Sequence, residues 1–401
     1  HGGNDMTTSA SSTDSKSAGI VRGQREHLLP AILHMYEEPL VLTGGEGVRV
    51  RDAEGCEYLD LFAGILTTSV GHCNARVNEA VTQQMNRLGH VSTLYATQTQ
   101  VEAARKIADI APGSLKRTFF SNSGTEAIET ALTMACLATG RSEIIALRLA
   151  YHGRSALATS ITAQAGWRPL ATPVAGIKHA QAPNPYRCPY KQPCDDSCVD
   201  RFVEDLEEVI VTTTNGKPAA FIAETILGVG GYIVPHPGYF KKAHEVIRRY
   251  GGLLIIDEVQ AGSGRTGSHW FGIQHAGVEP DIMQFAKAIT SGYFPLGGIG
   301  ISGRIAASLE ESDSPFMHAF TYNGHPVGCA VALRNLDIIE EEDFCGQAAS
   351  KGAYLLESLV SALADHPHVG DIRGKGLMCG VEYVRDRESK EEFPAEEKIG
   401  A

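Results

Sequence analysis

Short apolar segments alternate with amphipathic helical segments between residues 75 and 315, and this alternation constrains the fold most. Residues 125–139 place apolar side chains three and four positions apart, and Gly140 follows as a helix C-cap. Residues 238–250 form a second predicted helix. Strand–helix–strand order predicts an α/β fold with a mostly parallel sheet covered by helices on both faces. The predicted strands are 118–121, 144–147, 221–224, 253–257 and 281–285.

The two flanks of this region have a different pattern. Residues 40–62 predict two or three short strands with glycine turns, residues 326–365 two helices, and residues 370–384 further strands. Residues 180–200 are rich in Pro and Cys and predict a loop. We therefore expect the following domain organisation: 1–19 a flexible leader or tag, 20–74 the first segment of a smaller α+β domain, 75–315 a large domain, and 316–401 the second segment of the smaller domain.

Composition excludes several classes of function. The 401 residues are 43% hydrophobic with a net charge of −12, which is typical of a soluble globular protein and disfavours nucleic acid as a partner. No apolar run approaches the roughly 20 residues of a membrane span. Nine cysteines and no signal peptide at the start favour a reducing cytoplasm.

Two charged residues stand at predicted strand ends. Lys287 follows the apolar strand 281–285 among small neighbours, where partial desolvation makes a lysine a usable amine nucleophile. Asp257 ends the strand 253–257, at the edge where parallel sheets bind ligands. Each has an ordinary alternative: the lysine reaching for solvent at a strand end, and the aspartate acting as a helix cap.

A third feature is a strand that leads into a helix at residues 121–127. Ser123, Gly124 and Thr125 bring hydroxyls and free backbone N–H groups to a helix N-terminus, which favours an anion. Ser123 and Glu126 also fit a capping box, and the two roles are compatible. An anion site, a carboxylate and an amine at the strand ends of one sheet are what pyridoxal phosphate (PLP) requires of a protein.

From about Glu38 to Tyr383 the sequence resembles the class III aminotransferases, which are PLP enzymes of fold type I. The resemblance implies a large domain with a seven-stranded, mostly parallel sheet flanked by helices, a smaller α+β domain, and a homodimer with active sites at its interface. The matching blocks, in family order, are SGTEA (123–127), YHGR (151–154), DEVQ (257–260), GRTG (264–267), AK (286–287), PLGG (295–298), TYNGHP (321–326) and RGKGL (373–377).

The resemblance also implies roles around the cofactor ring. Lys287 would carry PLP as a Schiff base and move the proton, and Asp257 would hold the ring nitrogen. Val259 and Tyr151 would cover the two ring faces, and Gln260 would approach the ring hydroxyl. For Tyr151 the alternative is a core aromatic, and for Gln260 it is an ordinary loop hydrogen bond.

Further cofactor contacts follow from the same resemblance. Ser123, Gly124 and Thr125 would bind the phosphate, helped by Thr321 of a partner subunit. His152 and Glu224 would also lie at the cofactor. A local turn hydroxyl is the alternative for Thr321, and a loop hydrogen bond is the alternative for Glu224.

The substrate side rests on three residues. Arg373 would bind a substrate carboxylate, since a guanidinium is a two-pronged donor; a surface salt bridge is the alternative. Arg154 would hold a remote carboxylate, as in 4-aminobutyrate or β-alanine, unless it faces solvent or an acid. Leu66 stands near where many members carry an aromatic residue lining the substrate pocket, which leaves the size of that pocket open.

We therefore predict an aminotransferase that works in two half-reactions. An amine or ω-amino acid is the donor, and pyruvate, glyoxylate or 2-oxoglutarate is the acceptor. A PLP-dependent racemase, epimerase or phospho-lyase of the same family is the alternative. Family chains normally continue beyond the equivalent of Ala401, so we expect the smaller domain to be truncated and the activity of this form to be in doubt.

Two other patterns point elsewhere and are weaker. Residues 262–267 fit GxGxxG, but no helix begins inside the motif as dinucleotide binding requires. Cys188, Cys194 and Cys198, with His179 upstream, lack the paired CxxC spacing of a zinc site. We expect neither NAD nor a bound metal.

Overall fold

A computed structural model describes residues 15–31, 39–169, 174–191, 193–311, 316–397 and 399. The chain divides into two compact units. One holds the described residues up to Phe62, residues 71–74 and those from Phe393 onward, and the other holds residues 63–70 and 75–392. The grouping of residues 20–74 with 316–401 into one smaller domain stays a prediction.

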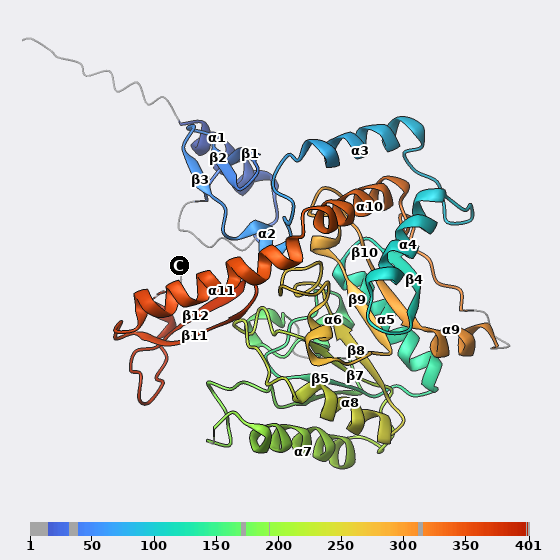
Figure 1. Cartoon of the computed structure of the whole chain (residues 1–401), viewed down its shortest axis with the longest axis vertical. Coiled ribbons are helices and arrows are strands. Elements are labelled where there is room, and N and C mark those ends of the chain that lie inside the picture. Colours follow the sequence, from blue (N-terminus) through green and yellow to red (C-terminus); the bar gives the residue numbers. More distant parts are fainter. Residues whose placement is uncertain are drawn as a thin grey trace, which may run out of the picture. The chain divides into compact units, whose positions relative to one another are not determined.

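A seven-stranded sheet forms the centre of the larger unit (Figure 1). Strands β9, β8, β7, β5 and β6 run parallel, and β10 is antiparallel to both of its neighbours, β4 and β9. The predicted fold class and the mostly parallel sheet are confirmed. In spatial order the strands are β4 (Leu115–Ser121), β10 (Gly297–Ser302), β9 (Ile282–Phe285), β8 (Leu253–Asp257), β7 (Ala220–Glu224), β5 (Ile144–Leu147) and β6 (Ile177–Ala180).

Both faces of this sheet are buried, which is why its central strands are apolar without interruption. In β8, Leu254 and Ile256 pack into one core cluster with helices α4, α7, α8 and α10, while Leu253 and Ile255 pack into a second cluster with α5, α6 and α9. The helices of this unit are α2 (Ala63–Leu66), α3 (Ala75–Arg87), α4 (Gln98–Ile110), α5 (Gly124–Thr139), α6 (Ala156–Ile161), α7 (Asp196–Thr213), α8 (Tyr239–Arg249), α9 (Gly303–Glu310), α10 (Pro326–Glu341) and α11 (Phe344–Leu363).

The strand and helix predictions agree with these bounds to within a few residues. The predicted C-cap Gly140 adopts the left-handed conformation, with φ of 66°. The strands expected at 370–384 are β11 (Val369–Lys375) and β12 (Met378–Tyr383), an antiparallel hairpin beside α11 (Figure 1). None of the described helices is long and apolar enough to span a membrane.

Two local predictions need correction. Residues 196–200 are not part of a loop but begin α7, because the Asp195 carboxylate accepts the N–H groups of Ser197 and Cys198 and caps that helix. The expected leader 1–19 ends in a helix, α1 (Lys16–His27), which Ser15 caps; residues 1–14 lie outside the described residues. The smaller unit also holds the predicted strands, an antiparallel sheet of β1 (Leu42–Glu46), β2 (Arg49–Asp52) and β3 (Glu57–Leu59).

Candidate active site

Three polar side chains lie side by side at the carboxyl ends of adjacent parallel strands. The register pairs Glu224 of β7 with Asp257 of β8, and Asp257 with Gln284 of β9. All three are buried. The apolar residues before them fix the strands, so the sheet itself brings these polar groups to one edge.

Asp257 is bonded to a histidine from a distant loop. His152 Nδ1 lies 2.7 Å from Asp257 Oδ2, and the N–H of Val259 donates to Asp257 Oδ1 at 3.0 Å. Burial alone would raise the pKa of Asp257, but the hydrogen bond and charge of His152 outweigh it and hold that pKa below its usual value. Asp257 is therefore a buried carboxylate that stays ionised.

Glu224 accepts two backbone N–H groups, from Tyr151 and Gly228, both at 2.9 Å. Burial, helped by the charge of Asp257, raises the pKa of Glu224 to about 7, although His152 and the two N–H groups oppose the shift. The Tyr151 ring packs edge-on against Trp167, with centroids 5.3 Å apart. These contacts bring Tyr151 and His152 to the same strand ends as the two carboxylates.

Lys287 follows β9 directly and has a left-handed backbone, with φ of 48°. Burial lowers the pKa of Lys287, and the nearby charge of Arg265 adds to this, while Asp257 and Glu224 act in the opposite direction. The predicted amine therefore lies within electrostatic reach of both carboxylates. An amine with a lowered pKa has a larger neutral, nucleophilic fraction near pH 7.

The N-terminus of α5 adjoins these groups. Ser123 caps the helix by accepting the N–H of Glu126 at 3.1 Å, as predicted. A Cβ built on Gly124 would lie 3.2 Å from Val259, so Gly124 and Val259 are in close contact. A Cβ on Gly153, whose φ is 129°, would come within 2.4 Å of Thr125 Oγ1. The cradle at the helix start is thus shaped by two glycines that leave room for its hydroxyls and N–H groups.

Several buried polar atoms at this edge have no hydrogen-bond partner among the described residues, including His152 Nε2, Gln260 Oε1 and both amide atoms of Gln284. A Cβ on Gly228 would lie 1.8 Å from Gln260 Oε1, so glycine is needed there to admit the amide. Buried polar groups are rarely left unpaired, so the Gln260 oxygen is available to a further hydrogen-bond donor.

The residues predicted for the substrate lie in different settings. Leu66 is buried against Ile226, Ala261 and Met378. Arg154 is exposed; its Nη1 donates to the carbonyl of Trp167 at 2.8 Å. Thr321 is exposed in the turn before α10, and its expected role concerns a partner subunit's cofactor, so it remains a prediction.

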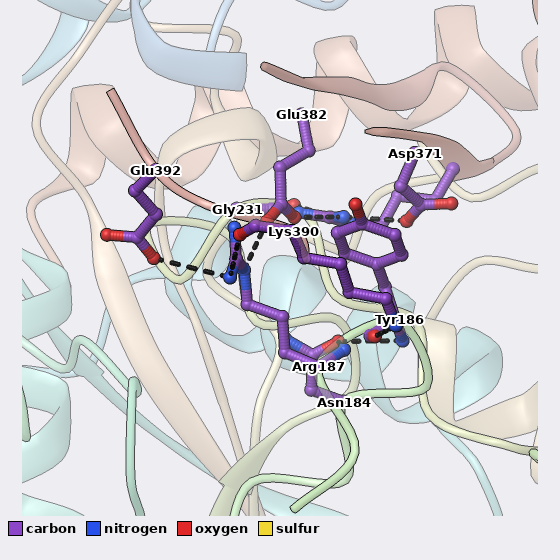
Figure 2. Close-up of polar contacts among 9 residues, drawn as sticks. Asn184, Tyr186, Arg187, Gly231, Asp371, Glu382, Lys390 and Glu392 are labelled. Carbon is purple, nitrogen blue, oxygen red and sulfur yellow. Dashed lines mark hydrogen bonds and ion pairs between the residues drawn. The ribbon is translucent and has the colours of Figure 1, made fainter. Parts of the chain in front are cut away.

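Arg373, on β11, is held by two carboxylates. Its Nη1 donates to Asp371 at 2.7 Å and to Glu382 at 2.6 Å, and its Nε donates to the carbonyl of Gly231 at 2.7 Å. Arg187 also donates to Glu382, so this carboxylate is shared between two arginines (Figure 2). Much of the charge of Arg373 is therefore neutralised within the protein.

The cysteine-rich segment brings two thiols close together. Cys188 Sγ lies 3.5 Å from Cys198 Sγ. Within the part of the chain that the structure describes, no group of three or more His, Cys, Asp or Glu side chains could hold a metal ion.

Three residues near the site were missed by sequence reasoning. Glu258 is buried and accepts the N–H groups of Gly272 and Ile273. Asn335 of α10 donates to the carbonyls of Ala288 and Ile289, directly after Lys287. Arg265 stands in the GRTG block but received no role. No local pattern distinguishes any of the three, since each depends on a partner from another element.

Comparison with known proteins agrees with this arrangement. Residues 33–399 match the family model Aminotransferase class-III. The chain belongs to the class III aminotransferase family. It is 39% identical over 381 residues to alanine–glyoxylate aminotransferase 2 homolog 2, mitochondrial, of Arabidopsis thaliana, covering 95% of this chain and 77% of that protein.

Solved structures match equally well. An (S)-enantioselective omega-transaminase from Thermomicrobium roseum is 45% identical, with a TM-score of 0.90, covering 96% of this chain and 88% of that one. The omega-transaminase from Pseudomonas jessenii in complex with PMP is 35% identical, with a TM-score of 0.89, covering 93% and 86%. The protein is a fold type I aminotransferase, and enzymes of this class use PLP.

The residues present fit that cofactor. The α5 N-terminus offers an anion site, the ionised Asp257 suits a protonated ring nitrogen, and the unpaired Gln260 Oε1 is free to bond a ring substituent.

Proposed function

We propose that this protein transfers an amino group from an amine or ω-amino acid to a 2-oxo acid, with Lys287 and Asp257 at the centre of the site. The observation that carries this proposal is the buried, ionised Asp257 at a strand end beside a lysine whose pKa is lowered. The relatives support the substrate class: one is named for alanine and glyoxylate, another as an omega-transaminase.

Lys287 would hold the cofactor aldehyde through its amine, and its free amine would be the group that moves a proton at the reacting carbon. Its lowered pKa suits both tasks, since general bases work best when their pKa lies near the working pH. When bound, PLP supplies an electron-withdrawing ring that makes the proton on the donor carbon removable.

Asp257 keeps the ring nitrogen protonated, and His152 orients Asp257 through the 2.7 Å bond. Ser123, Gly124 and Thr125 would hold the phosphate, and Gln260 would bond the ring hydroxyl. Val259 and Tyr151 would pack against the ring.

On the substrate side, Leu66 lines the pocket, and Arg154 is the residue that would favour a donor with a remote carboxylate. Asp371 and Glu382 already bind Arg373 and partly neutralise its positive charge. We therefore expect Arg373 to attract a substrate carboxylate less strongly than the resemblance implied. A racemase or phospho-lyase would use the same cofactor groups. Formation of both keto product and aminated acceptor distinguishes transamination from these.

We also propose a homodimer, with Thr321 contributing to the partner's site. A hydrogen bond between Thr93 and Asn323 joins two segments that expose large apolar side chains, which a partner would bury. The exposed apolar side chains are Leu94 (89% exposed), Tyr95 (66%), Met317 (90%) and Tyr322 (57%). Sedimentation of an active monomer would contradict the dimer.

A cytoplasmic location is part of the proposal too, supported by the many free cysteines among the described residues. The Arabidopsis relative is named as mitochondrial, so cell fractionation decides between the two compartments.

The function is tested by the absorbance spectrum of the protein mixed with PLP. We expect a visible band that borohydride abolishes, with the added mass found on the peptide containing Lys287. Lys287→Ala should remove the band and the conversion of pyruvate to alanine. A colourless wild-type protein, or turnover retained in the variant, would refute the proposal.

A further inference from the structure

Three cysteines lie together in the segment that leads into α7. Cys188 Sγ is 3.5 Å from Cys198 Sγ, and Cys194, between them in the sequence, interacts with both thiols. A disulfide has a sulfur–sulfur bond of about 2.05 Å, so the sulfurs of Cys188 and Cys198 need to approach each other by roughly 1.5 Å. The two residues are 10 positions apart, and a bond between them closes a short loop.

Backbone turns hold both members of this pair. The carbonyl of Cys188 accepts the N–H of Lys191 at 3.2 Å, which closes a turn directly after the first thiol. The Asp195 carboxylate accepts the N–H of Cys198 at 3.1 Å and so fixes the second thiol in the first turn of α7. The backbone on both sides therefore sets the contact between the two sulfurs.

The three thiols differ in their access to solvent. Cys198 is 1% exposed, Cys188 is half-buried, and Cys194 is exposed. Burial raises the pKa of Cys198 to about 12, and it raises the pKa of Cys194 as well. Since a thiolate and not a thiol attacks sulfur, the cluster reacts slowly at neutral pH and faster as the pH rises. An oxidant from solution meets Cys194 first.

The segment that carries Cys188 also holds the β11–β12 hairpin. Arg187 donates from Nε to Glu382 at 2.5 Å and from Nη1 to the carbonyl of Lys390 at 3.0 Å (Figure 2). The Lys390 ammonium donates in turn to the carbonyl of Tyr186 at 2.5 Å. A covalent bond from Cys188 to α7 therefore fastens this hairpin contact to a helix of the core.

We propose that Cys188 and Cys198 form a reversible disulfide, with Cys194 as the exposed thiol that takes up oxidation from a low-molecular-weight disulfide. The proposal goes beyond the aminotransferase function and does not depend on it. In a reducing compartment the thiols are the resting form, and the disulfide forms when the small-molecule thiols around the protein become oxidised.

The exchange balances in three steps. The Cys194 thiolate attacks the small disulfide and releases one small thiol, which leaves a mixed disulfide on Cys194. The Cys198 thiolate then attacks the Cys194 sulfur and releases the second small thiol. Finally the Cys188 thiolate attacks the Cys198 sulfur and frees Cys194. Two cysteines have then lost two electrons and two protons, and the small disulfide has been reduced to two thiols.

The test exposes the whole protein to oxidised glutathione and maps its disulfides by mass spectrometry of unreduced peptides. We expect a bond between Cys188 and Cys198, with two hydrogens lost, that dithiothreitol reverses. The exposed Cys56, in the smaller unit, should carry glutathione as a mixed disulfide. The rate of bond formation should rise by up to about tenfold per pH unit above about pH 7, as the thiolate fraction rises.

Single substitutions separate the roles of the three thiols. Cys188→Ser should prevent the bond and leave glutathione on Cys194. Cys194→Ser should give the same bond about tenfold more slowly or worse, because the oxidant must then reach the less exposed pair directly. Cys73→Ser removes an exposed thiol outside the cluster and should behave as the wild type.

The bond also has a structural readout. In the oxidised wild type the thermal midpoint should rise by about 2–6 °C over the reduced protein, since the bond restricts the unfolded chain. Amide hydrogen exchange in residues 184–191 should slow by about threefold or more. Neither change should appear in Cys188→Ser after the same treatment.

A mixed disulfide on Cys194 that never passes to the pair, or an end product between Cys194 and Cys198, would overturn the proposal. Equal rates of bond formation in Cys194→Ser and the wild type would show that oxidation does not enter through Cys194. If Cys188→Ser does not fold, the disulfide map of the wild type and the rate in Cys194→Ser decide.

Discussion

His152 Nδ1 lies 2.7 Å from Asp257 Oδ2, and both side chains are buried. Burial alone would lower the pKa of His152, but the bond to Asp257 raises it above its usual value. The raised pKa of His152 favours its protonated form and the lowered pKa of Asp257 favours the carboxylate, so the two side chains stabilise each other's charged forms. His152 fixes the orientation of the carboxylate, whose second oxygen accepts the N–H of Val259.

Asp257→Asn tests the charge at this position. The amide keeps the size of the side chain but cannot hold a protonated ring nitrogen, so we expect kcat/KM to fall by about two to three orders of magnitude. Steady-state assays with saturating PLP measure the loss. Thermal unfolding serves as the control for folding, and a folded variant with more than a tenth of wild-type activity would contradict the assignment.

Glu258 gives the unfolding free energy a pH dependence. Burial raises the pKa of Glu258 to about 8, from an ordinary value of 4.5, although two backbone N–H groups act against the shift. Between these pH values the unfolded chain has released a proton that the folded chain keeps. Stabilisation from this proton is complete below pH 4.5 and is lost as pH rises through 8.

The measurement is urea unfolding of the wild type and Glu258→Gln from pH 4.5 to 8. Over this range the wild type should lose stability relative to the variant, with a slope of at most about 1.4 kcal/mol per pH unit. Parallel curves for the two proteins would show that Glu258 is ionised throughout.

Asn335 fixes the turn that follows Lys287. Its Nδ2 donates to the carbonyl of Ala288 at 2.9 Å and to that of Ile289 at 3.0 Å, and the side chain is fully buried. Asn335→Leu keeps the volume but removes the donor to the Ile289 carbonyl and leaves the Ala288 carbonyl with only the N–H of Ser291, so we expect a loss of about 1–3 kcal/mol in unfolding free energy and weaker PLP binding. Leu336→Met, on the same buried helix, is the control and should cost less than about 1.5 kcal/mol. Similar losses in both variants would mean that packing, not hydrogen bonding, explains the effect.

The sheet and its strand ends were predictable because they follow from local patterns. Uninterrupted apolar runs gave β5, β7 and β8, and Asp257 and Glu224 stand where those runs end. Strand β10 was missed because its sequence, GGIGIS, lacks such a run. Glycine is required in this strand because the neighbouring strand lies very close: a Cβ on Gly298 would lie 2.5 Å from the carbonyl of Phe119 on β4.

The partners of the site residues were not predictable, because they come from distant elements. His152 and Asp257 are 105 residues apart, and Asn335 and Ala288 are 47 apart. The sequence marked Arg265 as part of a family block, but only the structure shows that its Nη2 donates to Ser69 and that its Nε is buried without a partner among the described residues. Composition and periodicity carry no information about such pairings.

Glu382 connects two arginines, and its removal tests how much that connection stabilises the β11–β12 hairpin. It accepts from Arg373 Nη1 at 2.6 Å and from Arg187 Nε at 2.5 Å, and the Glu382 and Arg373 side chains are 17% and 13% exposed (Figure 2). Glu382→Gln leaves both cations with less counter-charge in a partly buried setting, so we expect a loss of about 1–3 kcal/mol in urea unfolding.

Glu310→Gln is the matched control, since Glu310 pairs with Arg117 on the surface at 3.2 Å, where both side chains are about two-thirds exposed. That substitution should cost less than about 1 kcal/mol. Because Asp371 still holds Arg373 in Glu382→Gln, activity toward isopropylamine should remain. Equal stability losses in the two variants would show that the Arg187–Glu382–Arg373 cluster contributes no more than an exposed ion pair.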